Sequence, residues 1–309
     1  MGVYAKIKIL VVFYSQTGQL GKILNSVMSP LSGDERFEVT TLELKPETEY
    51  PFPWSAFSFF SIFPECFEEI PVQLKNFQID NSKNFDLIIL GYQPWFLSPS
   101  LPVTSFLQAP EAGVLFKNKP VITVLGCRNM WLMAQEKLER RINGLGGSVK
   151  GKVALSDRHG NIISLFTVIG WLLKGKKKNY LKVLPESGVS ETDISESSKF
   201  GELIRDKLIS GNLEELQHEL IKSRAIDIQP KLYLLEKRGS RSFSIFARFI
   251  RKKGGPEESK RNTRLRLFMY ILPPAIILLS PITTIVTAII ILLNKKKLNK
   301  EIKKLYYPL

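Results

Sequence analysis

Residues 15–19 read Ser-Gln-Thr-Gly-Gln and separate an apolar run, Ile7 to Tyr14, from a segment whose apolar residues have helical spacing, Leu20 to Met28. A polar turn between a buried strand and a helix can surround a phosphate with backbone N–H groups and hydroxyls, and the positive end of the helix adds to the attraction. The turn has neither the Gly-Lys-Ser/Thr signature of triphosphate loops nor the GxGxxG spacing. The same residues also fit an ordinary polar turn with a helix cap. Both interpretations stay open at this point.

The turn belongs to a repeating pattern of strand-like and helical segments. Four more apolar runs of strand length follow it: Phe37 to Leu44, Phe85 to Gly91, Pro120 to Gly126 and Val149 to Ser156. Helical segments are expected near residues 103–107 and over 131–143. Continuous apolar runs are typical of strands buried on both faces of a parallel sheet. The alternation predicts an α/β fold with a doubly wound, five-stranded parallel sheet that binds ligands at the carboxyl ends of its strands.

The turn resembles the phosphate loop of the flavodoxin family. Ser15, Thr17 and Gly18 match that loop, whereas Leu20 stands where a final hydroxyl is usual. The loops GYQPWF (91–96) and GCRNMW (126–131) are similar to the two flavodoxin loops that contact the flavin. The resemblance implies FMN as cofactor and the strand order 2-1-3-4-5. The cofactor-binding residues that it implies are Ser15, Gln16, Thr17, Gly18, Gln19, Leu20, Gln93, Pro94, Trp95, Phe96, Gly126, Cys127, Arg128, Asn129 and Trp131.

Asp157 and His159 follow the last expected strand, at the edge where a parallel sheet binds its ligands. Histidine titrates near neutral pH, so these two residues are the candidates for catalytic proton transfer. The competing interpretation is an exposed Asp-Arg-His-Gly turn. Arg128 would either balance negative charge on a reduced flavin or lie on the surface. Cys127 is expected to be a small packing residue rather than a redox thiol.

An aromatic insert, residues 45–71, interrupts the pattern between the second and third expected strands. Its aromatic side chains would either wall a pocket for an alkyl chain or add packing beneath a long loop. These side chains are Phe52, Trp54, Phe59, Phe60 and Phe63.

The insert, the segments YSQTGQL and QPWFLSP, and an apolar C-terminal span make the chain similar to the dialkylresorcinol condensing enzymes, which are flavodoxin-like proteins of dialkylresorcinol and flexirubin-type pigment biosynthesis. That resemblance implies a 2,5-dialkylcyclohexane-1,3-dione substrate, made by a partner ketosynthase and taken on to the aromatic resorcinol. The chain itself is not expected to condense acyl groups, because a ketosynthase needs a Cys-His-His set and His159 and His218 are the only histidines.

The formal net charge of +15 is concentrated in the C-terminal half of the chain. Residues 1–165 hold 16 Lys and Arg against 15 Asp and Glu, whereas residues 238–304 hold 16 basic and three acidic residues. This basic region flanks the longest apolar run, which indicates contact with anionic lipid rather than with nucleic acid. The two cysteines, Cys66 and Cys127, have neither a CxxC spacing nor histidines nearby, so no metal site is expected and a reducing compartment fits.

Leu267 to Leu293 contains 27 residues without a charged side chain, enough to span a membrane. Pro273, Pro274 and Pro281 are expected to break a helix there. Both flanks are basic, which favours the cytoplasmic face of the plasma membrane for each of them. A single crossing and a re-entrant hairpin with both ends in the cytoplasm therefore both stay open.

These patterns divide the chain into a core and a membrane-associated extension. Residues 162–173 are apolar but too few to span a bilayer, so a buried or interfacial helix is expected there. The predicted units are an FMN-binding domain (1–160, with the insert 45–71), a helical extension (161–237), a basic amphipathic juxtamembrane segment (238–266), a membrane segment (267–293) and a basic tail (294–309).

Three functions are compatible with this organisation. The first is an FMN-dependent oxidoreductase that acts on a lipophilic small molecule such as the dione. The second is a membrane-anchored electron carrier without an organic substrate, which the nearly neutral N-terminal half disfavours because small flavodoxins are usually acidic around the flavin. The third is a scaffold that has lost the cofactor, an alternative that Leu20 leaves open.

Overall fold

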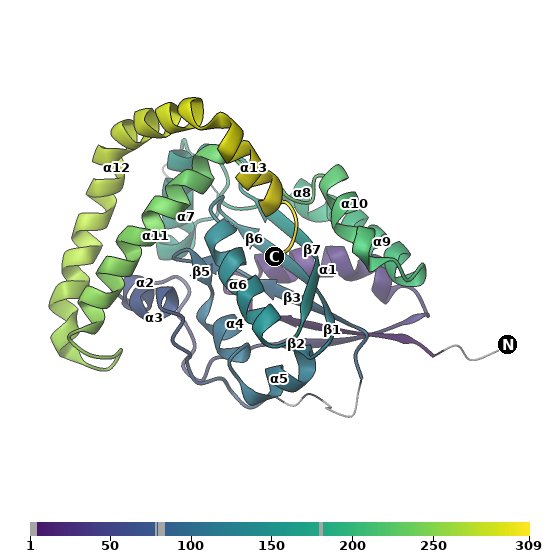
Figure 1. Cartoon of the computed structure of the whole chain (residues 1–309). Helices are drawn as coiled ribbons and strands as arrows, with labels where there is room; N and C mark the ends of the chain where they lie inside the picture. Colours follow the sequence, from purple (N-terminus) through teal and green to yellow (C-terminus); the bar gives the residue numbers. More distant parts are fainter. Residues whose placement is uncertain (1–4, 78, 80–83, 179–181) are drawn as a thin grey trace.

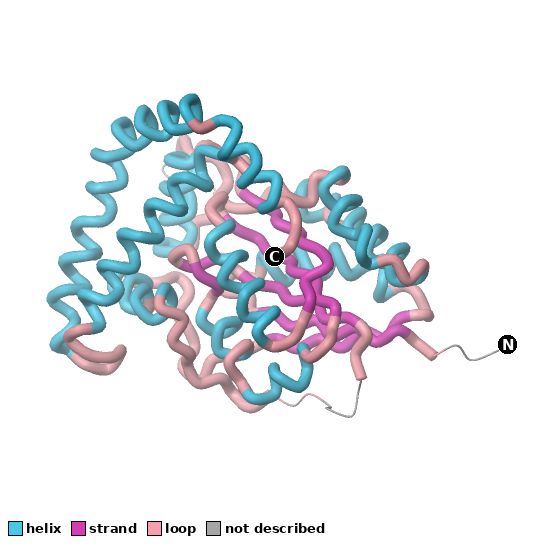
Figure 2. The backbone as a smooth tube through the Cα atoms, viewed as in Figure 1, coloured by secondary structure: helices cyan, strands magenta, loops and turns pink. Residues whose placement is uncertain are grey.

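The computed structural model describes residues 5–77, 79, 84–178 and 182–309. A five-stranded parallel sheet lies at its centre, with helices on both faces (Figure 1, Figure 2). Its strands, in spatial order, are β2 (Phe37–Glu43), β1 (Ile7–Phe13), β3 (Leu87–Tyr92), β6 (Pro120–Cys127) and β7 (Ser148–Ser156). A small antiparallel hairpin, β4 (Pro94–Trp95) and β5 (Ser98–Pro99), follows β3. Without this hairpin the strand order is 2-1-3-4-5, so the predicted doubly wound α/β fold is confirmed.

The central strands are apolar because both of their faces are covered. Every residue of β3 is buried, and Ile9 and Leu10, neighbours in β1, are both fully buried. Successive side chains of a strand point to opposite faces, so an uninterrupted buried run needs helices on each side. β1 pairs in parallel with two strands, and its Val11 lies opposite Thr41 of β2 and Ile89 of β3.

One face of the sheet is covered by four helices, three of them from beyond residue 190. They are α1 (Gln19–Ser32), α8 (Glu191–Glu196), α9 (Ser198–Ile209) and α10 (Leu216–Lys222), the last following a short 3-10 turn, η1 (Leu213–Glu215). α9 lies directly against α1, because a Cβ added to Gly201 would stand 1.9 Å from the carbonyl oxygen of Val27. These helices therefore share one apolar core with the sheet.

The opposite face carries a second set of helices, which includes the C-terminal one. They are α4 (Leu101–Phe106), α5 (Pro110–Phe116), α6 (Leu132–Gly144) and α13 (Lys295–Leu305). Leu298 and Ile302 of α13 are buried in the same apolar cluster as the sheet residues Leu10 and Ile88. The C-terminus of the chain thus returns to the sheet.

The remaining helices, short and long, gather beyond the carboxyl ends of the strands (Figure 1). They are α2 (Ala56–Ser61), α3 (Phe63–Phe67), α7 (Asn161–Lys174), α11 (Pro230–Arg251) and α12 (Asn262–Leu293), with a 3-10 turn, η2 (Ser259–Arg261), before α12. The insert residue Phe63 stacks on Phe268 of α12 with ring centroids 4.2 Å apart, and Phe60 contacts the same ring at 6.0 Å. This part of the insert therefore packs against the C-terminal helices.

α12 is one continuous helix of 32 residues, although it contains Pro273, Pro274 and Pro281. The prediction that these prolines break the helix is wrong. A proline inside a helix removes one N–H donor and crowds the carbonyl group four residues earlier, and a bend in the helix relieves that crowding. Figure 1 shows α12 curving around the outside of the molecule. Within the described residues it is the one helix long and apolar enough to cross a membrane, judged by length and composition.

Candidate functional site

The predicted phosphate turn lies between β1 and α1, at the carboxyl edge of the sheet. Gly18 is the N-cap residue in a left-handed conformation (φ 76°), and Oγ of Ser15 accepts a hydrogen bond from the backbone N–H of Gly21, in the first turn of the helix, at 3.3 Å. Within the described residues, the backbone N–H groups of Thr17, Gly18, Gln19 and Leu20 have no hydrogen-bond partner. A Cβ added to Gly18 would meet no atom within 4 Å. Free N–H groups at a helix N-terminus beside open space are suited to an anion.

Gln16 connects this turn to two other segments. Its backbone N–H donates to Oε1 of Gln93 at 3.3 Å, in the loop after β3. Its side-chain amide donates to the carbonyl oxygens of Tyr50 and Pro51, in the insert, at 3.4 and 3.2 Å. The Tyr14 hydroxyl donates to Oε1 of Gln16. The turn, the β3 loop and the insert therefore meet at one place.

Four aromatic rings pack beside the turn. The ring of Trp95 lies 5.7 Å from that of Tyr14, 5.3 Å from that of Tyr50 and 6.0 Å from that of Trp54, each time nearly perpendicular. Burial raises the pKa of both tyrosines, so their hydroxyls stay protonated. Trp95 is only partly buried, which leaves it able to contact a planar ligand at this edge.

The loop after β6 points its polar side chains toward the start of α7. Arg128 donates from Nη1 to the carbonyl oxygen and Oδ1 of Asn161 at 2.9 and 2.7 Å, and Asn129 donates to Oγ of Ser164 at 3.1 Å. Burial lowers the pKa of Arg128, and its hydrogen-bond acceptors among the described residues are all neutral. Oδ1 of Asn129 is buried and has no hydrogen-bond partner in the part of the chain that the structure describes. A desolvated cation and an unpaired amide oxygen therefore lie side by side in this loop.

Asp157 and His159 are in contact and differ in their exposure to solvent. Asp157 is 3% exposed, and its Oδ1 accepts from the backbone N–H of His159 at 2.9 Å and lies 2.6 Å from Nδ1 of His159. His159 itself is exposed. A carboxylate in this position holds the imidazole with Nδ1 protonated and leaves Nε2 free to accept a proton. Asp157 thus orients His159, and His159 is the solvent-accessible residue of the pair.

A segment that the sequence did not single out joins the turn to Asp157. The Gln19 side chain is paired with the backbone of Val189, donating to its carbonyl oxygen at 3.1 Å and accepting from its N–H at 3.2 Å. The preceding residue, Gly188, donates its N–H to Oδ2 of Asp157 at 3.3 Å. Gly188 has a φ of +83°, and a Cβ there would stand 2.8 Å from both Gln19 and Trp171. The amide of Gln19 is therefore used to hold this segment.

Several other predicted cofactor residues have their side chains occupied within the fold. Leu20 is 1% exposed in the core below the turn, so it offers only its backbone N–H. Trp131 is 3% exposed and belongs to the core on the α6 face. Phe96 has its ring 4.9 Å from Phe59 and 5.3 Å from Phe63, among the insert aromatics.

The remaining predicted residues shape the loops. Pro94 pairs across the β4–β5 hairpin, and a Cβ on Gly126 would stand 2.6 Å from Cδ1 of Ile23, so this glycine lets α1 approach the sheet. Burial raises the pKa of Cys127, which keeps its thiol protonated and unreactive. That agrees with the expected packing role of Cys127.

Glu236 of α11 is a site residue that the sequence analysis missed. It is fully buried and accepts hydrogen bonds from the backbone N–H groups of Trp131 and Met133 at 3.0 and 2.9 Å. It thereby fixes the β6 loop and the start of α6 to the C-terminal region. The available signal was its position: Glu236 follows Leu232 and Tyr233 at helical spacing, on the face of α11 that is otherwise apolar.

Glu236 is expected to make stability depend on pH near neutrality. Burial raises its pKa from 4.5 to about 7, so the folded state binds this proton more tightly than the unfolded state. The resulting stability is complete below about pH 4.5 and is lost as the pH rises through about 7. Between about pH 6 and pH 8 the loss is about 1.4 kcal/mol. The thermal midpoint of Glu236→Gln should therefore fall less over this range than that of the parent, and parallel curves would contradict the assignment.

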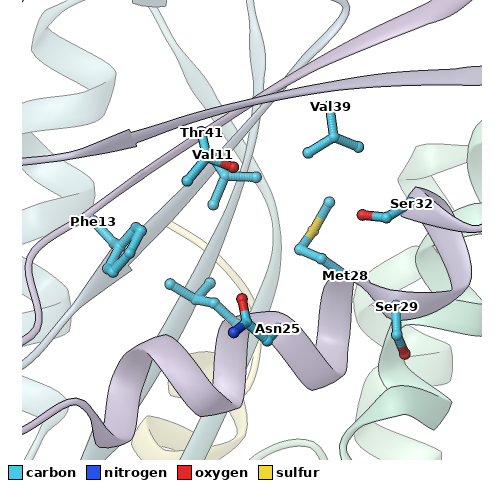
Figure 3. Close-up of a pocket in the computed structure, with 9 residues that line it drawn as sticks. Val11, Phe13, Asn25, Met28, Ser29, Ser32, Val39 and Thr41 are labelled. Atoms are coloured by element: carbon cyan, nitrogen blue, oxygen red, sulfur yellow. The ribbon is translucent and has the colours of Figure 1, made fainter.

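Two hollows among the described residues are lined by none of the predicted site residues. One, of about 240 Å³, lies between α1 and the outer part of the sheet (Figure 3). Its lining residues are Val11, Phe13, Leu24, Asn25, Met28, Ser29, Ser32, Val39 and Thr41. The other, of about 400 Å³, lies between residues 71–77 and 105–110. The candidate site is a convergence of loops at the carboxyl edge, where the turn, the loop after β3 and the insert meet.

Comparisons with known proteins give matches only among solved structures. No protein-family model matches the chain, and no curated protein matches it. A flavoprotein in complex with FMN from Lactobacillus acidophilus is 19% identical, with 48% of this chain and 92% of that chain covered and a TM-score of 0.38. A putative flavoprotein from Bacteroides eggerthii is 16% identical, with 52% and 96% covered and a TM-score of 0.39. Flavodoxin 1 from Bacillus cereus is 14% identical, with 63% and 95% covered and a TM-score of 0.35. At these values no site or ligand is carried over from them.

Proposed function

We propose that the chain binds FMN at the carboxyl edge of its sheet and uses it for a redox reaction. The turn after β1 carries this proposal, because four backbone N–H groups without partners among the described residues, and the open space beside Gly18, suit a phosphate. Thr17 adds a hydroxyl that has no partner among the described residues. The buried side chain of Leu20 means that this cradle relies on backbone donors more than on hydroxyls.

The flavin ring would lie between the loops after β3 and β6. Trp95 offers a partly exposed aromatic face on one side. On the other side, Arg128 and the unpaired Oδ1 of Asn129 offer a positive charge and an acceptor to the polar edge of a flavin. A desolvated guanidinium favours the form of the cofactor that carries negative charge, because its field is poorly screened there.

The proposed reaction is the oxidation of a lipophilic cyclic 1,3-diketone to a resorcinol, as the resemblance to dialkylresorcinol condensing enzymes implies. Aromatisation removes two hydrogens from the dione, one as a hydride and one as a proton. Bound FMN supplies a hydride acceptor. Nε2 of His159 would take the proton, and Asp157 would stabilise the imidazolium that results. A ketosynthase would supply the dione.

The C-terminal helices would hold this enzyme at the cytoplasmic face of the plasma membrane, where a substrate with two alkyl chains partitions. α12 is apolar, with a mean hydropathy of 2.7 over its most apolar window, and only 6% of that window is buried. Exposed apolar residues of α7, next to the β6 loop, extend this apolar surface: Ile162, Ile163 and Phe166.

The visible absorbance spectrum of the protein purified in detergent tests the cofactor. A flavin spectrum, with FMN identified by mass after release, supports the proposal, whereas a colourless protein would favour the cofactor-less scaffold. A flavin that no dione reduces, but that a redox partner does, would favour the electron carrier.

The expected catalytic result is bleaching of the flavin absorbance when a 2,5-dialkylcyclohexane-1,3-dione is added without oxygen. His159→Gln should slow this bleaching by about 100-fold or more while FMN stays bound, because a positioned base contributes about 10²–10⁴-fold. His218→Gln is the matched control, since His218 is the other histidine and its Nδ1 lies near the Tyr307 hydroxyl, at the C-terminus. Equal rates in His159→Gln and the control would remove His159 from the reaction.

A further inference from the structure

We propose that α12 enters and leaves the bilayer on the same face, as an arch. Its two ends, which we call its feet, are Arg261 before the helix and α13 after it, and both stay bound to one folded domain. This inference rests on the proposed membrane attachment and decides between the two routes that the sequence left open. The apolar surface of α12 would contact the hydrocarbon layer of an anionic membrane. The structural basis is that both ends of this apolar helix are fixed to the sheet domain by buried charged groups.

The first foot is fixed by Arg261, immediately before α12. Its side chain is 1% exposed and forms a two-point ion pair with Glu65 of α3, at 2.6 Å from Nη1 and 2.9 Å from Nη2. Nη2 also donates to the carbonyl oxygen of Ser61. A guanidinium buried with its carboxylate resists separation, since either group left alone would be a desolvated charge. Phe268, in the second turn of α12, stacks on Phe63 of the same insert.

The second foot is fixed by the segment that follows α12. Lys152 of β7 and Glu139 of α6 form a buried ion pair at 3.3 Å, and both are at most 3% exposed. Lys152 donates to the carbonyl oxygens of Leu305 and Tyr307, each at 2.8 Å, and Glu139 accepts from the N–H of Leu309 at 2.7 Å. The C-terminal segment therefore completes a polar network inside the sheet domain.

The part of α12 between the feet has few contacts with the rest of the protein. Its exposed side chains include Tyr270, Leu278, Ile282, Ile285, Leu292 and Leu293. A contact near its C-terminal end is the hydrogen bond from Arg238 of α11 to Oγ1 of Thr287, at 3.2 Å. Exposed apolar side chains on most sides of a helix need a non-aqueous surrounding.

A single crossing conflicts with these two feet. A helix of 32 residues is about 48 Å long, and a straight crossing would place its ends on opposite sides of a hydrocarbon layer about 30 Å thick. Arg261 and α13 are bound to the same folded domain, which lies on one side. The curvature of α12 around its three prolines gives the arch instead (Figure 1).

The charges at the feet fit an anionic lipid surface. Arg264 and Arg266 lie in the first turns of α12, and Lys295, Lys296 and Lys297 follow its end. Basic residues beside an apolar segment stay on the cytoplasmic side and are attracted by its anionic headgroups. Here both feet are basic, so the charge pattern and the buried ion pairs place both ends on the same face.

Site-directed labelling with a membrane-impermeant maleimide tests the arch in full-length protein. Glu257→Cys reports the first foot, Lys300→Cys the second and Leu278→Cys the middle of α12, while Glu111→Cys marks the side of the sheet domain; all four parent residues are exposed. The parent, whose Cys66 is buried and Cys127 partly buried, gives the background. Labelling is compared in intact cells and in inverted membrane vesicles, before and after detergent.

The arch predicts that Glu257→Cys, Lys300→Cys and Glu111→Cys are all labelled in inverted vesicles and protected in intact cells. Leu278→Cys should stay unlabelled in both until detergent is added. Labelling of Lys300→Cys from the outside of cells would overturn the arch in favour of a single crossing, and labelling of Leu278→Cys without detergent would place α12 outside the lipid. Release of the parent from membranes by high salt alone would instead contradict the proposed hydrophobic attachment through α12, because salt does not screen hydrophobic insertion.

Discussion

The double substitution Thr17→Ala with Gly18→Val is expected to yield a folded protein without FMN. The turn provides four backbone N–H groups without partners among the described residues, and the space beside Gly18 is open to 4 Å. A valine side chain would fill the space where a phosphate must approach these groups, and the alanine removes the Thr17 hydroxyl, which has no partner in the described part of the chain. Flavin content per protein should fall from near one to near zero, as measured by absorbance after denaturation.

Backbone strain must be separated from loss of the site, because Gly18 has a positive φ that valine adopts poorly. Ser210→Ala with Gly211→Val is a matched control. Gly211 also has a positive φ, of 69°, with no atom within 4 Å of an added Cβ, and it lies after α9, away from the site loops. The control should lose similar stability and keep its flavin. Equal flavin loss in both variants, or full retention at the turn, would place the phosphate elsewhere.

The strands of this fold could be read from the sequence because their signal is local. Buried parallel strands must be apolar on both faces, so runs such as 120–126 stand out without any knowledge of their neighbours. The observed strand β6, Pro120–Cys127, differs from that run by one residue. The phosphate turn was visible for the same reason, since it directly joins one such run to a helix.

The contacts that hold the loops together could not be predicted from the sequence, because the residues in contact are far apart in the chain. Glu236 accepts hydrogen bonds from the N–H groups of Trp131 and Met133, which lie more than 100 residues away in the sequence. Gln19 is hydrogen-bonded to Val189, 170 residues away. A sequence shows that a carboxylate lies on an apolar helix face but not which donors meet it. Composition likewise does not say which face of the sheet the helices of residues 191–222 cover.

The sequence did not decide the path of α12, for a related reason. Proline propensities describe isolated helices, in which the lost hydrogen bond and the ring clash favour a break. In the fold, the two ends of α12 are held by Arg261 and by α13, so the helix is retained and bends instead. The deciding interactions are again long-range, because Glu65 precedes Arg261 by 196 residues.

Glu65→Gln is expected to cause the largest loss of stability among single substitutions at the C-terminal helices. It leaves Arg261, which is 1% exposed, as a buried cation facing a neutral amide. Breaking a buried ion pair by removing one partner costs about 3–5 kcal/mol, because the remaining charge is neither solvated nor paired. For a chain of 309 residues, this corresponds to a fall of roughly 5–8 °C in the thermal midpoint, which can be measured in detergent by intrinsic tryptophan fluorescence.

Two companion variants show whether this loss comes from an unpaired buried charge. Glu65→Met with Arg261→Met removes both charges and keeps apolar volume, so it should recover much of the midpoint lost in Glu65→Gln. Glu49→Gln removes the carboxylate of an exposed pair with Lys75, and solvent screening should leave its midpoint unchanged. With its first foot released, Glu65→Gln should also be cleaved faster than Glu49→Gln by trypsin at Arg261, which is buried in the parent. If Glu65→Gln has the thermal midpoint of the parent and is cleaved no faster, the ion pair does not hold α12, and the first end of the arch must depend on other contacts, such as those of the Phe268 ring with Phe60, Phe63 and Phe246.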